Sequence, residues 1–323
     1  MKKRQWAKLS GLSLAAFGAV MVIKSFLPRR LAGSKPRLVV RDGLSREQLP
    51  EIRVTFLRCG HATLPEALAV RGSFSLAPLV LAHSAVLIEH PRAIFLYDTG
   101  LCSDIFSFLK GEPLFFRRTL ASFVLDQPLA AHLQRLGVNR LDFALLSHLH
   151  WDHVSGVPDI AGVPLRINKV EYDAARLGRF DQWHALVPRL LGSSPLELFS
   201  CDGPPYEGFA SSHDLFGDGS IVLVPLPGHT AGNTGMFINR ANGGRLLLLG
   251  DAVWVADNYL RPATMHPFFW SLVTGDSATA CQTLIDLHYF AASHPEVSLI
   301  AMHDARMQET FMRVEASLAQ RWV

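Results

Sequence analysis

The feature that constrains this chain most is an apolar run that leads directly into a cluster of histidines. The run "LDFALLSH" covers residues 141–148, and the chain continues as "LHWDHVSG" to Gly156. Burying several titratable groups without partners costs stability, so the fold must supply partners for them. Four such side chains lie within six residues here: His148, His150, Asp152 and His153.

A bound metal ion is one way to satisfy this cluster. In an extended segment His148 and His150 point the same way, because side chains alternate with a period of two. A turn at Trp151 then sends Asp152 and His153 toward a second point. Imidazole nitrogens and carboxylate oxygens bind zinc at roughly 2.0–2.2 Å. A single buried histidine is usually a satisfied core residue, but four titratable groups in six residues favour a metal site.

Short apolar runs bounded by Gly, Pro or Asp recur on both sides of the cluster, as is typical of strands. Helical patterns lie between and after them, and strand runs in both halves predict two sheets packed face to face with helices outside. The strands are expected within 52–60, 84–91, 93–100, 141–148, 220–229, 234–240, 245–251 and 297–304, and the helices within 129–136, 169–177, 181–191 and 277–292.

Several polar residues share one position relative to these strands. His148, His229, Asp251 and His303 all stand at or just past the carboxyl end of a predicted strand. Such ends are where α/β proteins build their sites. Taken alone, His229 could be a turn residue and His303 a neighbour of the helix cap Asp304, but their joint occurrence favours a common site.

The N-terminus differs from the rest of the chain. Residues 1–37 hold nine of the 31 Lys and Arg residues and no acid, which leaves the remainder with a net charge of −6. Leu9–Ile23 is apolar, shorter than a comfortable membrane span but of the size of a signal-peptide core. We therefore expect residues 1–30 to be a membrane anchor or signal segment, 31–37 a linker and 38–323 one domain, in a membrane-anchored or exported protein.

Charge and cysteine content exclude other classes. A mildly acidic body offers no electrostatic surface for nucleic acid, so we expect no nucleic-acid partner. The four cysteines form no CxxC pair, which excludes a thiolate zinc ribbon and leaves ordinary buried thiols or one or two disulfides. They are Cys59, Cys102, Cys201 and Cys281.

The pattern His-x-His-x-Asp-His after an apolar strand resembles the signature of the metallo-β-lactamase superfamily. The resemblance extends to "PLPGHTAGN" around His229, "LLLLGDA" around Asp251, "IAMHD" around His303 and "LIEHPRAIFLYDTG" with Asp98. It covers residues 52–304 in family order, and its closest motifs are those of acyl-homoserine lactonase-like and glyoxalase II-like members. The fold that it implies is α/β, a four-layer αββα sandwich of two mixed sheets with outer helices.

The resemblance also implies a ligand set for two zinc ions, although iron or manganese suits the same side chains. His148, His150 and His229 would hold one ion, and Asp152, His153 and His303 the other. Asp251 would bridge the two ions together with a hydroxide. The carboxylate of Asp152 would also act as the catalytic group that passes a proton to the leaving group.

Departures from the family pattern concern outer contacts. Asn233 replaces the second histidine of "PGHTPGH", and Trp254 stands where many lactonases carry a tyrosine. The indole nitrogen of Trp254 can donate a hydrogen bond. His266 is a second candidate donor, and Asp98 is a candidate outer contact of the metal ligands.

The expected activity is hydrolysis of an ester or lactone, with a hydrophobic acyl part indicated by the aromatic segments 113–124 and 265–273. A thioesterase or phosphodiesterase using the same metals remains an alternative. From a different class, an iron-dependent redox member of the fold is the other alternative, which the metal identity would distinguish. A small-molecule ester, lactone or thioester is the expected partner, and the sequence leaves the oligomeric state open.

Overall fold

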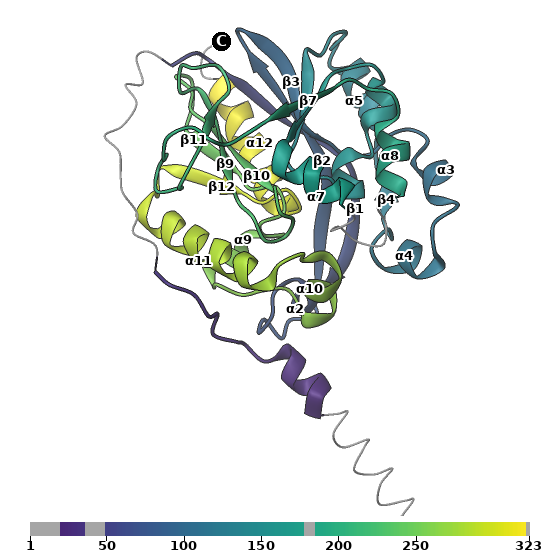
Figure 1. Ribbon diagram of the computed structural model, residues 1–323, viewed down its shortest axis with the longest axis vertical. Coiled ribbons are helices and arrows are strands. Elements are labelled where there is room, and N and C mark those ends of the chain that lie inside the picture. The colour runs from purple at the N-terminus through teal and green to yellow at the C-terminus, as the bar shows by residue number, and fades with distance from the viewer. Residues whose placement is uncertain (1–19, 36–48, 178–184, 321–323) are drawn as a thin grey trace, which may run out of the picture.

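Two β-sheets face each other in the computed structural model of this protein, which describes residues 20–35, 49–177 and 185–320 (Figure 1). The first sheet has seven strands in the order β4-β1-β2-β3-β5-β6-β7. Its first four strands pair antiparallel, whereas β3, β5, β6 and β7 run parallel. The strands are β1 (Arg53–Pro65), β2 (Pro78–His90), β3 (Ala93–Thr99), β4 (Val124–Leu125), β5 (Phe143–Leu146), β6 (Leu165–Asn168) and β7 (Leu196–Phe199).

The second sheet has five strands in the order β12-β11-β10-β9-β8. Only β11 and β12 are parallel neighbours, so this sheet is mixed as well. Because β9 and β11 both run antiparallel to β10, their carboxyl ends lie at the same edge. The strands are β8 (His213–Asp214), β9 (Ile221–Pro225), β10 (Thr234–Ile238), β11 (Arg245–Leu248) and β12 (Val297–Ile300).

The period-two alternation of the strands separates the core into layers. In β3, Phe95 and Tyr97 face the second sheet, where they pack with residues such as Leu223 and Met236. The intervening Leu96 faces the other way, toward the helices. Both faces of the central strands are therefore apolar, which explains their continuous hydrophobic runs.

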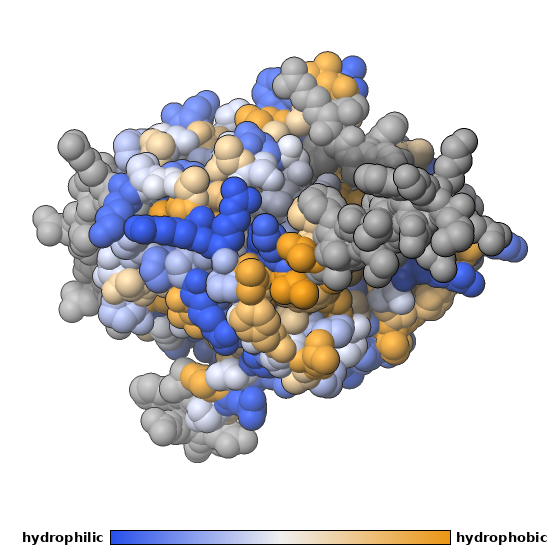
Figure 2. All heavy atoms as spheres, turned by 90° about the horizontal axis from the view of Figure 1, so that it is seen from below, coloured by the Kyte–Doolittle hydropathy of each residue, from blue (hydrophilic) through white to orange (hydrophobic). Residues whose placement is uncertain are grey.

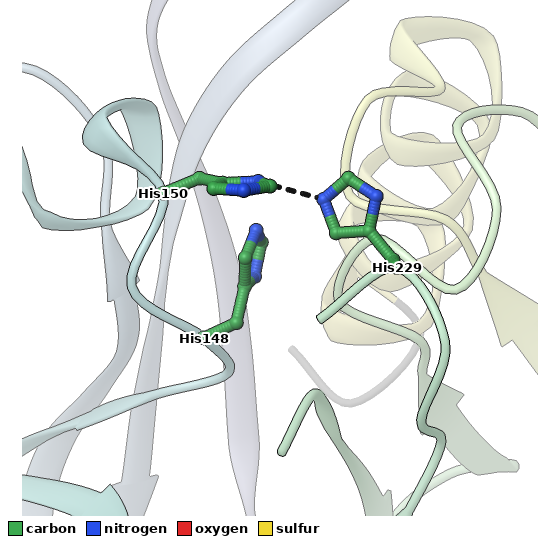
Figure 3. Close-up of side chains that lie close together, drawn as sticks. All are labelled: His148, His150 and His229. Carbon is green, nitrogen blue, oxygen red and sulfur yellow. Dashed lines mark hydrogen bonds between the residues drawn. The ribbon is translucent and has the colours of Figure 1, made fainter. Parts of the chain in front are cut away.

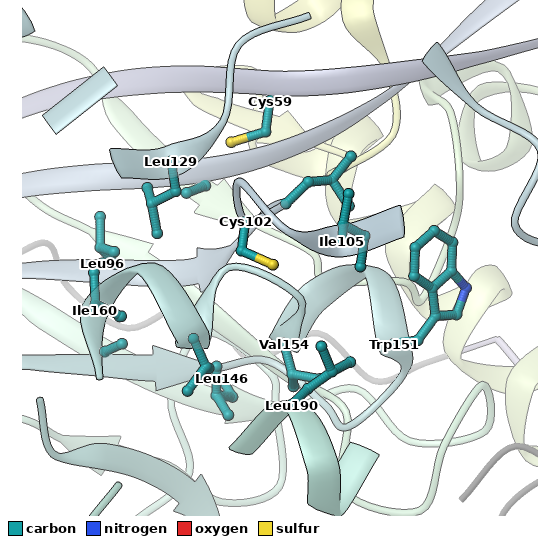
Figure 4. Close-up of a cluster of buried hydrophobic side chains, with 14 of the residues drawn as sticks. Cys59, Leu96, Cys102, Ile105, Leu129, Leu146, Trp151, Val154, Ile160 and Leu190 are labelled. Atoms are coloured by element: carbon teal, nitrogen blue, oxygen red, sulfur yellow. The ribbon is translucent and has the colours of Figure 1, made fainter. Parts of the chain in front are cut away.

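Helices cover the two outer faces (Figure 1). Helices α3, α4, α5, α6 and α8 pack on the first sheet, and Figure 4 shows this layer with the buried thiols of Cys59 and Cys102. Helices α9 and α11 cover the second sheet. All four cysteines are free. The helices are α2 (Glu66–Ala69), α3 (Ile105–Leu109), α4 (Leu114–Thr119), α5 (Leu129–Arg135), α6 (Trp151–Val154), α7 (Lys169–Arg176), α8 (Leu186–Leu191), α9 (Ala256–Leu260), α10 (Pro267–Val273), α11 (Ser277–Ser293) and α12 (Ala305–Gln320).

This architecture confirms the predicted αββα sandwich of two mixed sheets. One difference from the predicted strands lies in the β1–β2 hairpin. Strand β1 continues to Pro65, and β2 already begins at Pro78. The extension projects beyond the sandwich and packs against Trp254 and Met265. It thereby forms one wall of the region beside the histidine cluster.

The predicted membrane-anchored location is corrected by the structure. Residues 20–26 form a short helix, and within the described residues no helix is both long and apolar enough to cross a membrane. Residues 1–19, which carry most of the predicted apolar segment, lie outside the described part of the chain. The helix ends at residue 26, and Pro28 disfavours a helical conformation of the residue before it.

Candidate metal centre

The candidate ligands meet at one end of the sandwich, between the two sheets. The loop after β5 and helix α6 contribute side chains from the first sheet, and loops after β9, β11 and β12 contribute side chains from the second. The carboxyl ends of these strands lie at the same end of the sandwich, so side chains far apart in sequence come together. The structure groups all seven predicted ligands there: His148, His150, Asp152, His153, His229, Asp251 and His303.

Three of the histidines form a compact group (Figure 3). The rings of His148, His150 and His229 lie with their centroids 4.5–4.9 Å apart. His229 Nε2 and His150 Nδ1 are 2.8 Å apart. The buried nitrogens His148 Nε2 and His229 Nδ1 have no hydrogen-bond partner. Each of the three histidines offers one nitrogen to a common point, His148 Nε2 among them without a protein partner, as a metal ion requires.

Burial keeps two of these imidazoles neutral. Desolvation is the main reason why the pKa of His148 lies well below its usual value. The same effect, together with the neighbouring His150, lowers the pKa of His229 to about 3. Since a neutral imidazole presents a lone pair, both residues are in the form that binds metal.

The second group contains the carboxylates. Asp251 lies between the two groups, with Oδ1 3.2 Å from His153 Nε2 and Oδ2 3.4 Å from His229 Nε2. His303 Nε2 is 3.2 Å from Asp251 Oδ2 and 3.4 Å from Asp152 Oδ2. Asp251 therefore contacts histidines on both sides, as a bridging carboxylate would.

The carboxylates and histidines of this group shift each other's pKa values. Burial raises the pKa of Asp251 and Asp152, but the facing histidines more than offset it, and both pKa values lie below the ordinary range. Burial lowers the pKa of His153 and His303, but Asp251 is the strongest influence in the opposite direction and the net pKa of both is raised. These protons hold the positive charge that a metal cation would supply.

Outer contacts orient several of these side chains. Asp98, fully buried, accepts a 2.7 Å hydrogen bond from His153 Nδ1 and bonds from the backbone and hydroxyl of Ser147. His303 Nδ1 donates to the carbonyl of Ala82 at 2.7 Å. Asn233 accepts from the backbone N–H of Asp251 at 3.1 Å. With Nδ1 occupied, His153 and His303 turn Nε2 toward the cluster.

The two candidate donors are placed differently. Trp254 lines the cavity beside the cluster, its ring centroid 5.8 Å from that of His303, and its buried Nε1 has no hydrogen-bond partner. His266 lies away from the cavity lining, and both its ring nitrogens are engaged. Its Nδ1 caps α10, and its Nε2 is 2.7 Å from the hydroxyl of Ser25. The structure therefore does not support His266 as a donor at the metal cluster.

Sequence reasoning missed two buried residues here. Glu171 of α7 accepts hydrogen bonds from the backbone N–H groups of Leu149 and Gly232 at 2.8 and 2.9 Å, so it joins the loops that carry His150 and His229. His83 of β2 lies 3.3 Å from Asp152. A signal existed for each: His83 interrupts an apolar strand, and Glu171 lies on the buried face of an otherwise polar helix.

A cavity of about 280 Å³ opens above the cluster. Its apolar walls come from β2, α4 and α10, and the rings of Phe115 and Phe268 approach each other across these helices at 6.5 Å. Figure 2, viewed from the end that carries α2 and α10, shows apolar patches among hydrophilic residues. The apolar lining includes Leu64, Leu81, Phe116, Leu120, Trp254, Phe269, Leu272 and Val273.

Clustered imidazoles and carboxylates under an apolar cavity, at the strand ends of an αββα sandwich, define a metal-dependent hydrolase. The family model described as "Metallo-beta-lactamase superfamily" matches residues 79–280. This chain belongs to that superfamily, as its motifs predicted.

Two relatives with similar sequences are named as hydrolytic enzymes. A "probable metallo-hydrolase" of Mycobacterium tuberculosis (strain ATCC 25618 / H37Rv) is 30% identical over 223 residues. The match spans 64% of this chain and 64% of that relative's length. An N-acyl homoserine lactonase of a Bacillus species is 24% identical over 180 residues, 54% of this chain and 64% of that protein.

A solved structure shares the fold. It is that of an N-acyl homoserine lactone hydrolase with the product N-hexanoyl-L-homoserine at its catalytic metal center. The superposition has a TM-score of 0.61 with 17% identity, and it covers 81% of this chain and 96% of the other. At this level of identity the likeness concerns the fold.

Proposed function

We propose that this protein is a dinuclear zinc hydrolase that cleaves a lactone or ester with a hydrophobic acyl part. The observation that carries the proposal is the position of Asp251, whose two oxygens face histidines of both groups beneath an apolar cavity. The match to the metallo-β-lactamase superfamily supports a hydrolytic metal site. The resemblance to proteins named as lactonases supports the substrate class.

In this proposal each ion is held by three side chains in addition to the shared Asp251. One set is His148, His150 and His229; the other is Asp152, His153 and His303. The unpaired His148 Nε2 and the raised pKa of His153 support this assignment, because a cation would satisfy the nitrogen and replace the proton. Zinc suits such nitrogen and carboxylate donors.

When bound, the two ions would supply a water with a pKa lowered to about 7 and a Lewis acid for the substrate carbonyl. The protein's own groups would do the rest. The side chain of Asp152 is 12% exposed and faces the cavity, so it can pass a proton to the leaving oxygen. The Nε1–H of Trp254, buried and without a partner, is available to donate to the carbonyl oxygen as negative charge develops on it.

The cavity accounts for the hydrophobic part of the substrate. Its volume of about 280 Å³ is near the lower end of the usual range for small-molecule sites, roughly 300–1,000 Å³. The walls formed by Leu81, Phe116 and Phe269 would bury an alkyl chain, at about 0.8 kcal/mol for each CH₂ group removed from water. Longer acyl chains are therefore expected to be better substrates than short ones.

The test uses the full chain loaded with zinc and follows ring opening of N-decanoyl and N-butanoyl homoserine lactone by pH-stat. We expect turnover of both, a higher kcat/KM for the decanoyl compound, and a loss of about 10²–10⁴-fold in kcat for Asp152→Asn. Zinc content is measured for each variant, so that a proton-transfer defect is distinguished from loss of metal. A folded, fully zinc-loaded chain that hydrolyses neither these lactones nor p-nitrophenyl decanoate would show the proposal to be wrong.

A further inference from the structure

His83 is a buried imidazole that the recognised motif does not include. Its side chain is 6% exposed in the middle of β2, where its ring packs against those of Trp151 and His303 at centroid distances of 5.8 and 5.4 Å. Two hydrogen bonds hold this part of β2 against the loop after β12. The N–H of Ala82 donates to the carbonyl of His303 at 2.9 Å, and His303 Nδ1 donates to the carbonyl of Ala82 at 2.7 Å. The position of His83 relative to His303 is therefore set by the backbone.

The ring nitrogen of His83 shares a carboxylate oxygen with His303. His83 Nδ1 lies 3.3 Å from Asp152 Oδ2, and His303 Nε2 lies 3.4 Å from the same oxygen. All three ligand atoms lie within 4.8 Å of one another. Two ligands of one zinc ion, with bonds of about 2.1 Å and an angle of about 109° between them, are separated by about 3.4 Å. The three atoms therefore have the spacing of ligands around a single ion.

The environment of this nitrogen suits a metal ligand. His83 Nδ1 is buried, and the group nearest to it is the carboxylate of Asp152, to which it makes no well-aligned hydrogen bond. Two buried histidines outside the cluster are hydrogen-bonded: His132 Nε2 bonds to the carbonyl of Arg58 at 2.9 Å, and His90 Nε2 to the hydroxyl of Ser220 at 3.1 Å. Leaving a buried polar atom unpaired costs about 1–3 kcal/mol, which a ligand bond would remove.

We infer that His83 is an additional ligand of the metal ion held by Asp152 and His303. This inference rests on the proposed dinuclear site and extends it with a residue from β2. The ion would then be held from four separate segments: β2, the α6 segment, and the loops after β11 and β12. We expect it to be retained more tightly than a site formed by Asp152, His153, His303 and Asp251 alone.

The experiment measures metal binding by the full chain and needs no substrate. Wild-type protein, His83→Phe and His83→Gln are loaded with zinc, and bound zinc per chain is counted by mass spectrometry after gel filtration. Affinities for the two ions are measured by competition with a chromophoric chelator, and the cobalt-loaded proteins are compared by visible absorption. His132→Phe is the matched control, because it removes a buried histidine that is already hydrogen-bonded.

We expect both His83 variants to bind one ion at least 10-fold more weakly, to retain the other ion, and to show an altered cobalt spectrum. His132→Phe should keep both ions and the wild-type spectrum. The inference is overturned if a folded His83 variant keeps both affinities and the spectrum, or if the wild-type chain holds no second ion. Failure of lactone turnover with these metal results intact would overturn the proposed function and leave His83 as a ligand.

Discussion

At the scale of single residues, the geometry of the candidate centre depends on buried groups that do not face the cavity. Asp98 has a backbone φ of 55°, in the left-handed region that Asn and Asp tolerate better than other non-glycine residues. That conformation turns its carboxylate toward His153 and Ser147. The carboxylate determines which nitrogen of His153 carries the proton.

Asp98→Asn therefore tests whether this contact controls metal binding. Asn tolerates the same backbone, but its amide N–H₂ would oppose the N–H of His153 in one orientation and the N–H of Ser147 in the other. We expect zinc affinity to fall by about 10–100-fold, measured by chelator competition. Asp126→Asn is the matched control, because Asp126 makes a similar contact with His61 at the surface. Equal zinc affinity in Asp98→Asn and wild type would contradict the prediction.

Trp254→Phe tests the proposed donor while keeping an aromatic ring in the cavity wall. Removing Nε1–H should reduce kcat/KM for a lactone by about 10²-fold with zinc content unchanged, because one donor to the developing oxyanion is lost. His266→Gln should leave kcat/KM unchanged, since His266 lies outside the cavity lining. The donor role would be rejected if Trp254→Phe turned over the lactone at the wild-type rate.

At this scale, sequence reasoning found what was contiguous. The six residues from His148 to His153 form one recognisable motif. The order of motifs in the family located His229, Asp251 and His303. His83 is a single polar residue whose nearest partner, Asp152, lies 69 positions further along the chain. Glu171 is also a single polar residue, and its partners lie in two different loops. Only tertiary structure brings such partners together, so the local signals mark both residues as unusual without identifying their roles.

At the scale of elements, helix α7 connects the two ligand loops through Glu171. Gly232 is needed for this contact, because a Cβ there would come within 2.4 Å of the backbone nitrogen of Glu171. Burial is the main reason why the pKa of Glu171 is raised to about 7, although the backbone N–H groups of Leu149 and Gly232 partly oppose it.

This raised pKa predicts a pH dependence of stability. In the unfolded chain Glu171 has its ordinary pKa of 4.5 and loses its carboxyl proton above that pH, whereas the folded chain keeps the proton until about pH 7. The folded state then binds more protons, so this group's contribution to stability is greatest below pH 4.5 and is lost as the pH rises toward 7. The loss is on the order of 3 kcal/mol.

Glu171→Gln should remove that part of the pH dependence. We compare the free energy of unfolding of variant and wild type in urea at pH 5 and pH 8, with chelator present so that metal binding does not contribute. Relative to the wild type, the variant should have a higher free energy of unfolding at pH 8 than at pH 5. A difference that is the same at both pH values would contradict the raised pKa.

Eight of the described strands followed from local patterns, whereas the short strands β4, β6, β7 and β8 did not. The apolar runs that became β3, β5 and β9–β12 are buried on both faces, so hydrophobicity alone marks them. Strand β7 was missed because its residues are mostly exposed at the sheet edge. The far end of the β1–β2 hairpin was missed because its polar and proline residues resemble a loop, and cross-strand pairing stabilises it instead.

At the scale of the whole molecule, the candidate centre joins the two sheets. His148, His150, Asp152 and His153 come from the first sheet, whereas His229, Asp251 and His303 come from the second. Ions bound between them would act as cross-links across the sandwich. Without such ions the buried carboxylates are balanced by the facing His153 and His303, whose pKa values they raise.

Chelation should therefore lower the melting temperature of the whole domain. Free zinc at 100 times its Kd would stabilise the folded chain by about 2.7 kcal/mol per site, which corresponds to a rise of several degrees in the melting temperature. Calorimetry with and without EDTA measures this difference, and Asp251→Asn, which lacks the shared carboxylate, should show a smaller one. Identical melting curves for the zinc-loaded and chelated wild type would rule out a cross-linking role.

The distribution of the ligands along the chain also bears on biosynthesis. His148 and His303 are 155 positions apart, so at about 5–20 residues per second the ribosome makes them roughly 8–30 seconds apart. During that interval the nascent chain exposes the early histidines without the later ones. In the proposed dinuclear site, metal loading of the complete centre would therefore follow synthesis of β12.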